Sequence, residues 1–139
     1  MRLGEAHRRG ISVTLGLLDQ ALCEMESWAK GREVRSVLYE ERNDLSEDQR
    51  REILREVEDL RGILRQIIDF LGLRSTRRGA REEIWARCSG LWESLVELEG
   101  KYLKRYGEVP PELAEYLDPQ VAALIEGLQR ISAIISSHR

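Results

Sequence analysis

The sequence has few of the residues that build disulfide frameworks, and it lacks long apolar runs. Its 139 residues include two cysteines, Cys23 and Cys88, which are too few for such a framework. No stretch approaches the roughly 18 uninterrupted apolar residues that a membrane span needs. Residues 1–10 contain arginines but not the apolar stretch of a signal peptide. The sequence therefore predicts a cytoplasmic protein with reduced thiols and no membrane partner.

Motifs of common catalytic and cofactor sites are also missing. The two histidines, His7 and His138, lie at the chain ends, which argues against a histidine-activated nucleophile. The sequence has no Gly-rich phosphate loop. It also has no Glu-x-x-His motif of the kind that holds two metal ions inside a helical bundle. We therefore predict no metal site and no cofactor, and a function other than catalysis is the first interpretation.

What the sequence does contain is the composition of a helical globular domain. It has only three prolines, with 42% hydrophobic and 34% charged residues, and a net charge of −3 that gives no overall basic signal for nucleic acid. Four apolar stripes recur with steps that alternate between four and three residues, the period of a seam that packs against other helices. The seams are Ile11, Leu15, Leu18, Leu22, Met25 and Ala29; Ile53, Val57, Leu60, Leu64, Ile67 and Leu71; Ile84, Cys88, Leu91, Leu95, Leu98 and Tyr102; and Val121, Leu124, Leu128, Ile131 and Ile135.

Local start and stop signals divide these seams into helices. Ser46 with Gln49 three residues later predicts a capping box. Asp118 followed by Pro119 predicts the start of the last helix, because proline fits the first helical position. We expect helices over about 3–30, 47–71 and 77–106, a short helix over 112–117 and a last helix from 118, with Gly31, Gly72 and Gly107 as interruptions.

Matched helices with short connections place neighbours antiparallel. The sequence therefore predicts an all-α, single domain over residues 1–139, an antiparallel up-down four-helix bundle. Its two irregular features are a long connection between helices one and two and the short extra helix before helix four. The long connection, residues 32–45, fits either a helical extension or a structured loop.

In that topology an excess of arginine gathers at one end of the bundle. Positive side chains beside free helix N–H groups can form a site for a phosphate-bearing ligand, nucleic acid or an acidic protein partner. A solvated arginine-rich surface is the alternative reading. The candidate anion-binding residues are His7, Arg8, Arg9, Arg74, Arg77, Arg78, Arg81 and His138.

Two further surfaces are candidates for partner binding. Residues 32–45 are longer than a bundle needs, and long loops often carry function; their candidate interaction residues are Glu33, Arg35, Tyr39, Glu40, Arg42 and Asp44. Apolar residues beside the third seam predict an oligomer interface, where tryptophan is enriched. The candidate interface residues are Trp85, Trp92 and Val96, with a homodimer as the first expectation.

Three functions follow from these features. The leading hypothesis is a non-catalytic helical-bundle interaction or assembly protein that is oligomeric. The second is a nucleic-acid or phosphate-anion-binding accessory protein that uses the arginine-rich end. The third is a Mg-dependent hydrolase, because Glu41-x-x-Asp44 followed by Glu56-x-x-Asp59 resembles the paired acidic motifs of all-α nucleotide pyrophosphohydrolases. That resemblance covers four residues, and a solvated helix face is the alternative interpretation.

Overall fold

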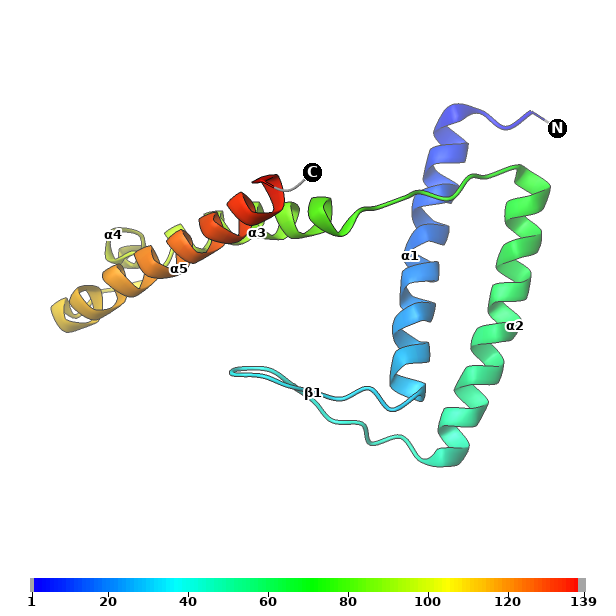
Figure 1. The fold of residues 1–139 in the computed structure, drawn as a ribbon, viewed down its shortest axis with the longest axis horizontal. Helices are drawn as coiled ribbons and strands as arrows, with labels where there is room; N and C mark the ends of the chain where they lie inside the picture. Colours follow the sequence, from blue (N-terminus) through cyan, green and yellow to red (C-terminus); the bar gives the residue numbers. More distant parts are fainter. Residues whose placement is uncertain (1, 138–139) are drawn as a thin grey trace. The chain divides into compact units, whose positions relative to one another are not determined.

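The computed structural model describes residues 2–137 and confirms the predicted all-α class (Figure 1). The chain divides into two compact units, Met1–Ser75 and Thr76–Arg139. The assignment of residues 1–139 to one domain stays a prediction. The elements are α1 (Glu5–Ala29), β1 (Val34–Arg35), β2 (Glu40–Glu41), α2 (Glu47–Leu71), α3 (Ala80–Val96), α4 (Gly100–Leu103), the 3-10 helix η1 (Lys104–Tyr106) and α5 (Pro111–Ser137).

In the first unit, α1 and α2 pack antiparallel as a helical hairpin (Figure 1). Arg8, near the start of α1, donates a hydrogen bond to the carbonyl of Leu71 at the end of α2. Glu26, near the end of α1, pairs with Arg61 in α2. The two helices therefore run in opposite directions along their whole length. Their buried residues are Leu22, Ala29, Val57 and Leu64.

The predicted helix ends of this unit are confirmed. The Ser46 hydroxyl accepts from the Gln49 N–H at 3.1 Å, and the Gln49 side chain accepts from the Ser46 N–H at 2.9 Å, which is a complete capping box. Gly31 follows α1 with φ 103°, and Gly72 follows α2 with φ 67°. These left-handed positions favour glycine, because a Cβ atom is strained there.

Residues 32–45 form a structured loop and do not extend α1. The loop contains a two-stranded antiparallel hairpin in which Val34 pairs with Glu41 and Arg35 with Glu40. Of the two interpretations that the sequence left open, the structured loop is therefore the one observed.

In the second unit, α3 and α5 pack antiparallel (Figure 1). The third helix was expected to continue to about Tyr106, and this is wrong, since α3 ends at Val96. The chain turns so that Gly100, the first residue of α4, lies against α5. A Cβ atom on Gly100 would come within 2.9 Å of the Ala114 Cβ, so only glycine allows this close approach.

The predicted helix start at Asp118 and Pro119 is also wrong. The last helix is continuous from Pro111 to Ser137, so the separate short helix over 112–117 does not exist and Pro119 lies inside α5. The Asp118 carboxylate does not cap α5 but accepts the N–H of Gly100 at 2.9 Å. Pro111 takes the first helical position that the sequence assigned to Pro119, and the carbonyl of Pro110 accepts from the Leu113 N–H.

Proline inside α5 leads to a stability prediction. Pro119 has no N–H for the carbonyl four residues earlier, which destabilises a helix interior. Pro119→Ala should raise the free energy of unfolding of the second unit by about 1 kcal/mol or more, measured by chemical denaturation. Pro111→Ala is the matched control and should bring no gain, because proline fits the first turn. A loss of stability in Pro119→Ala would instead indicate a helix that starts at Asp118.

Candidate functional site

Each long helix uses alternate members of its predicted seam, seven residues apart, to face its partner helix. These residues are buried or half-buried, and we call them the covered rows. They are Leu15, Leu22 and Ala29 on α1; Val57, Leu64 and Leu71 on α2; Cys88 and Leu95 on α3; and Val121, Leu128 and Ile135 on α5.

The intervening seam members remain in contact with solvent. We call the solvent-exposed members the open rows, and between 37% and 56% of the area of each residue is exposed. The open rows are Leu18 and Met25 on α1; Leu60 on α2; Ile84 and Leu91 on α3; and Leu124 and Ile131 on α5. The other intervening members, Ile11, Ile53 and Ile67, are half-buried. Each seam is therefore half-used, in the sense that one row is covered and one or more members of the other row are exposed.

The open rows of a hairpin lie on the same side of it. An α-helix has 3.6 residues per turn. A residue three positions after a covered residue, or four positions before it, therefore lies about 50° from it around the helix axis, in the same rotational direction in both cases. The offset is the same on both helices of each hairpin. Antiparallel helices are related by a two-fold axis perpendicular to their plane, so equal offsets bring both open rows to one side. Each hairpin therefore has an apolar open side formed by both of its helices.

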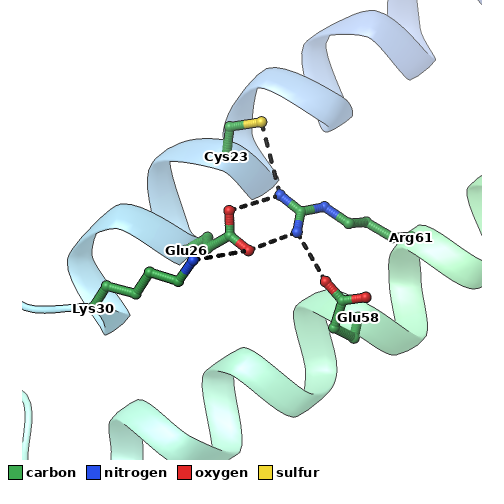
Figure 2. A network of polar contacts seen from close by, with 5 residues as sticks. All are labelled: Cys23, Glu26, Lys30, Glu58 and Arg61. Atoms are coloured by element: carbon green, nitrogen blue, oxygen red, sulfur yellow. Dashed lines mark hydrogen bonds and ion pairs between the residues drawn. The ribbon is translucent and has the colours of Figure 1, made fainter.

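The opposite side of the α1–α2 hairpin carries a polar network (Figure 2). The Arg61 guanidinium donates to both carboxylate oxygens of Glu26, at 2.7 and 3.2 Å, and to Glu58 at 2.9 Å. It also contacts the Cys23 sulfur at 3.8 Å, while Lys30 pairs with Glu26 at 3.8 Å. These side chains extend from α1 and α2 toward one another and join the two helices.

Hydrogen bonds shift the pKa values of the charged side chains in this network. The hydrogen bond from Arg61 holds the pKa of Glu26 below its usual range, against the opposing effect of desolvation. The same contacts raise the pKa of Arg61. Only 17% of the Arg61 side chain is exposed. The two-point contact with Glu26 therefore fixes the register of the hairpin on this side.

Loss of this contact should destabilise the hairpin. Arg61→Met keeps most of the apolar stem but leaves the Glu26 carboxylate without its main partner. We expect a lower melting temperature for Arg61→Met than for wild type. The matched control is Arg51→Met on the same helix, where the arginine is 67% exposed and pairs only with Asp48. Its stability should stay within about 0.5 kcal/mol of wild type. Equal effects of the two substitutions would contradict a structural role for the network.

Glu41 anchors the loop that joins α1 to α2. One carboxylate oxygen accepts from the Trp28 indole nitrogen at 2.5 Å, and the other accepts from Arg32 at 3.1 Å and from the Tyr39 hydroxyl. The Arg32 guanidinium also lies 5.5 Å from the centre of the Trp28 ring, within cation–π range. The β-hairpin is therefore held against the end of α1.

Asn43 provides a second anchor. Its side-chain amide donates to the carbonyls of Trp28, at 2.7 Å, and of Arg32, at 3.0 Å. Sequence reasoning missed this role of Asn43, and also the roles of Trp28 and Glu41. The only available signal was the general tendency of asparagine to bond to backbone in loops.

The six predicted interaction residues of this loop are all exposed. Glu33 accepts from the backbone N–H of Asn43 at 3.2 Å, and Tyr39 bonds to Glu41. The others project from the hairpin or its base. The exposed set is Glu33, Arg35, Tyr39, Glu40, Arg42 and Asp44.

The tip of the β-hairpin carries two apolar residues that the sequence analysis did not single out as a site. Val37 is 95% exposed and Leu38 is 99% exposed. They occupy the two-residue turn between Ser36 and Tyr39, where the Ser36 N–H bonds to the Tyr39 carbonyl at 2.8 Å. The favoured two-residue turns need positive φ angles, but neither residue has one. Turn chemistry therefore does not explain two large aliphatic side chains here.

Acid should weaken the Glu41 anchor. The hydrogen bonds from Tyr39 and Trp28 hold the pKa of Glu41 below its usual range of about 4.3. A carboxylate whose pKa is lower in the folded state than in the unfolded state contributes its full stabilisation of the fold at pH values above the unfolded-state pKa. That contribution is lost as pH falls through the folded-state pKa. We expect the Trp28 indole N–H resonance to move in NMR spectra below about pH 4. Glu41→Gln should abolish the movement; if the titration persists in this variant, another group is responsible.

The predicted anion-binding residues divide between the two units. In the first unit, Arg8 donates to the carbonyls of Leu71, at 3.3 Å, and Gly72, at 3.1 Å, so it caps the C-terminus of α2, where positive charge is favourable. His7, Arg9 and Arg74 are exposed. Arg77, Arg78 and Arg81 are exposed in the second unit, and Arg78 lies 3.8 Å from Glu83. His138 lies outside the described residues, and the gathering of these residues into one site stays a prediction.

One of the four acidic residues that resemble a magnesium-binding motif is engaged in other contacts. Both oxygens of Glu41 already accept hydrogen bonds from Trp28, Tyr39 and Arg32. Asp44, Glu56 and Asp59 are exposed. Within residues 2–137, no group of three or more histidine, cysteine or carboxylate side chains is placed to hold a metal ion.

The predicted oligomer interface lies on the second unit. Trp85 and Trp92 are exposed on α3, and Val96 is half-buried at its end. Their positions relative to Cys88 and Leu95 place them on the side of the hairpin opposite the open row. A hollow of about 390 Å³ lies beside Trp92, with Cys88 and Leu128 in its walls.

No protein-family model, curated protein or solved structure matches this chain. In the part of the chain that the structure describes, no helix has both the length and the apolar character needed to cross a membrane. Function is therefore inferred from the surfaces of the chain itself.

Proposed function

We propose that this protein is a non-catalytic interaction and assembly protein that forms homo-oligomers through the open sides of its helical hairpins. The observation that carries this proposal is the half-used seam. One row of each seam faces the partner helix, and seven members of the other rows are exposed, on the same side of both helices of their hairpin. A seam with two apolar rows is suited to a bundle of more than two helices.

The accessible surface supports the same proposal. The area of the chain is 11604 Å². Two separate folded domains that share its mass between them would expose about 8,900 Å² together, by the scaling for folded monomers. The excess is about 2,700 Å², whereas a standard protein interface removes about 800 Å² from each partner. The two-helix units therefore expose more surface than folded domains of their size.

The composition of the open sides is also that of an interface core. Leucine, isoleucine and methionine make up the open rows, and contiguous apolar patches on a protein surface mark binding sites. Their burial on association would provide the hydrophobic driving force. Catalytic chemistry is not needed for this role, since assembly acts through surface complementarity alone.

Solution mass tests the proposal. Light scattering across a range of concentrations should give a multiple of the 16.1 kDa chain mass, with a dimer as the first expectation. The double variant Leu91→Glu with Leu60→Glu places one charge on each open side and should lower the measured mass, because each charge would have to be buried on association. A wild-type mass of 16.1 kDa at every concentration would contradict the proposal.

A further inference from the structure

We infer that the open side of the α1–α2 hairpin is a docking surface for the same surface of a second copy, and that Phe70 of each copy inserts into a hollow beside Gly10 of the other. This inference rests on the proposed function and specifies its partner and contact. The resulting assembly would be a four-helix bundle that contains α1 and α2 from both copies.

The hairpin has one side suited to association and one that is not. Arg61, Glu26 and Glu58 occupy the polar side, where their charges pair with one another (Figure 2). The open side carries Leu18, Met25 and Leu60, and it is widened by residues that precede the covered row on α2. Two of these are apolar, Ile63, which is 53% exposed, and Phe70, which is 71% exposed, and the third is the exposed Glu56. Association through the open side leaves the polar network intact.

Phe70 projects from this side at the same level along the helix axes as a hollow on α1. The hollow has a volume of about 460 Å³ and lies on the first turns of α1. Gly10 contributes to it because a Cβ atom there would meet nothing within 4 Å. Phe70 lies at the same end of the hairpin, since Arg8 bonds to Leu71 and Gly72. The lining residues of the hollow are Ala6, His7, Gly10, Ile11, Thr14 and Leu15.

Symmetry makes this match reciprocal. A two-fold axis parallel to the helices would place α1 of one copy opposite α2 of the other while keeping the same ends together. Phe70 of each copy then meets the hollow of the other, so the contact occurs twice in a closed dimer. Both helices have 25 residues, so the two surfaces overlap along about 37 Å at 1.5 Å rise per residue.

The test fills the hollow and removes the projection separately. Gly10→Leu adds a side chain where the chain itself has room, and leucine also favours helix over glycine, so the hairpin should remain folded. Phe70→Ala removes the projecting ring. Each variant should weaken dimer association at least about 30-fold in sedimentation equilibrium, as expected for a residue that carries much of the binding energy. Circular dichroism at high protein concentration should show that both variants still fold into helices.

Gly16→Leu is the matched control, because Gly16 also has no neighbour within 4 Å and lies on the polar side of α1. It should leave the association constant unchanged. If wild type is oligomeric but Gly10→Leu and Phe70→Ala associate as tightly as wild type, the inference is overturned while the proposed function stands. If wild type is monomeric at every concentration, the proposed function fails and this inference fails with it.

Discussion

The structure depends on one geometric constraint: two antiparallel helices can bury only part of a wide apolar stripe. Each seam of this chain has two rows about 50° apart, and a single partner helix covers one of them. Leu22 and Leu64 are buried between α1 and α2, whereas Leu18 and Leu60 on the same helices are not. The second unit repeats the pattern, with Val121 buried and Leu124 exposed on α5. Part of each apolar stripe is therefore left exposed on its hairpin, and this exposed part is the basis of the proposed association.

Polar contacts decide which side of the first hairpin is left open. The pairing of Arg61 with Glu26 joins the helices on one side and satisfies groups that would be costly to bury alone. Such pairs contribute modest net energy but strong geometric specificity, since a planar guanidinium meets a carboxylate at two points. At one end of the hairpin Arg8 caps α2, and at the other end Glu41 and Asn43 hold the β-hairpin. The polar contacts thus fix the register, and the Arg61 network lies on the side opposite the open rows.

Sequence reasoning recovered the features that depend on local signals. The helix seams, the Ser46 capping box and the glycines after α1 and α2 follow from spacing and backbone preference within a few residues. It failed where a distant residue decides the outcome. Asp118 looked like a helix cap, but its carboxylate binds the N–H of Gly100, eighteen residues earlier in the chain. Residues 34–41 carry no turn signal, and their hairpin depends on contacts from Glu41 to Trp28 and Arg32. Periodicity identified both rows of each seam, yet it could not tell which row faces the partner helix, because that depends on three-dimensional packing.

The half-used seams also link folding to association. The conformational entropy lost on folding grows with the number of residues that become ordered, whereas the hydrophobic gain grows with the area that becomes buried. A two-helix unit orders many residues for a small buried area, and small units are for this reason marginally stable on their own. A second copy that covers the open side of α1 and α2 adds buried area without lengthening the chain. Under the proposed function, partner binding and stability are therefore parts of one equilibrium, and the folded population rises with protein concentration. Under this proposal, the exposed apolar side chains of Leu18, Leu60 and Phe70 belong to a hydrophobic core that a second copy completes.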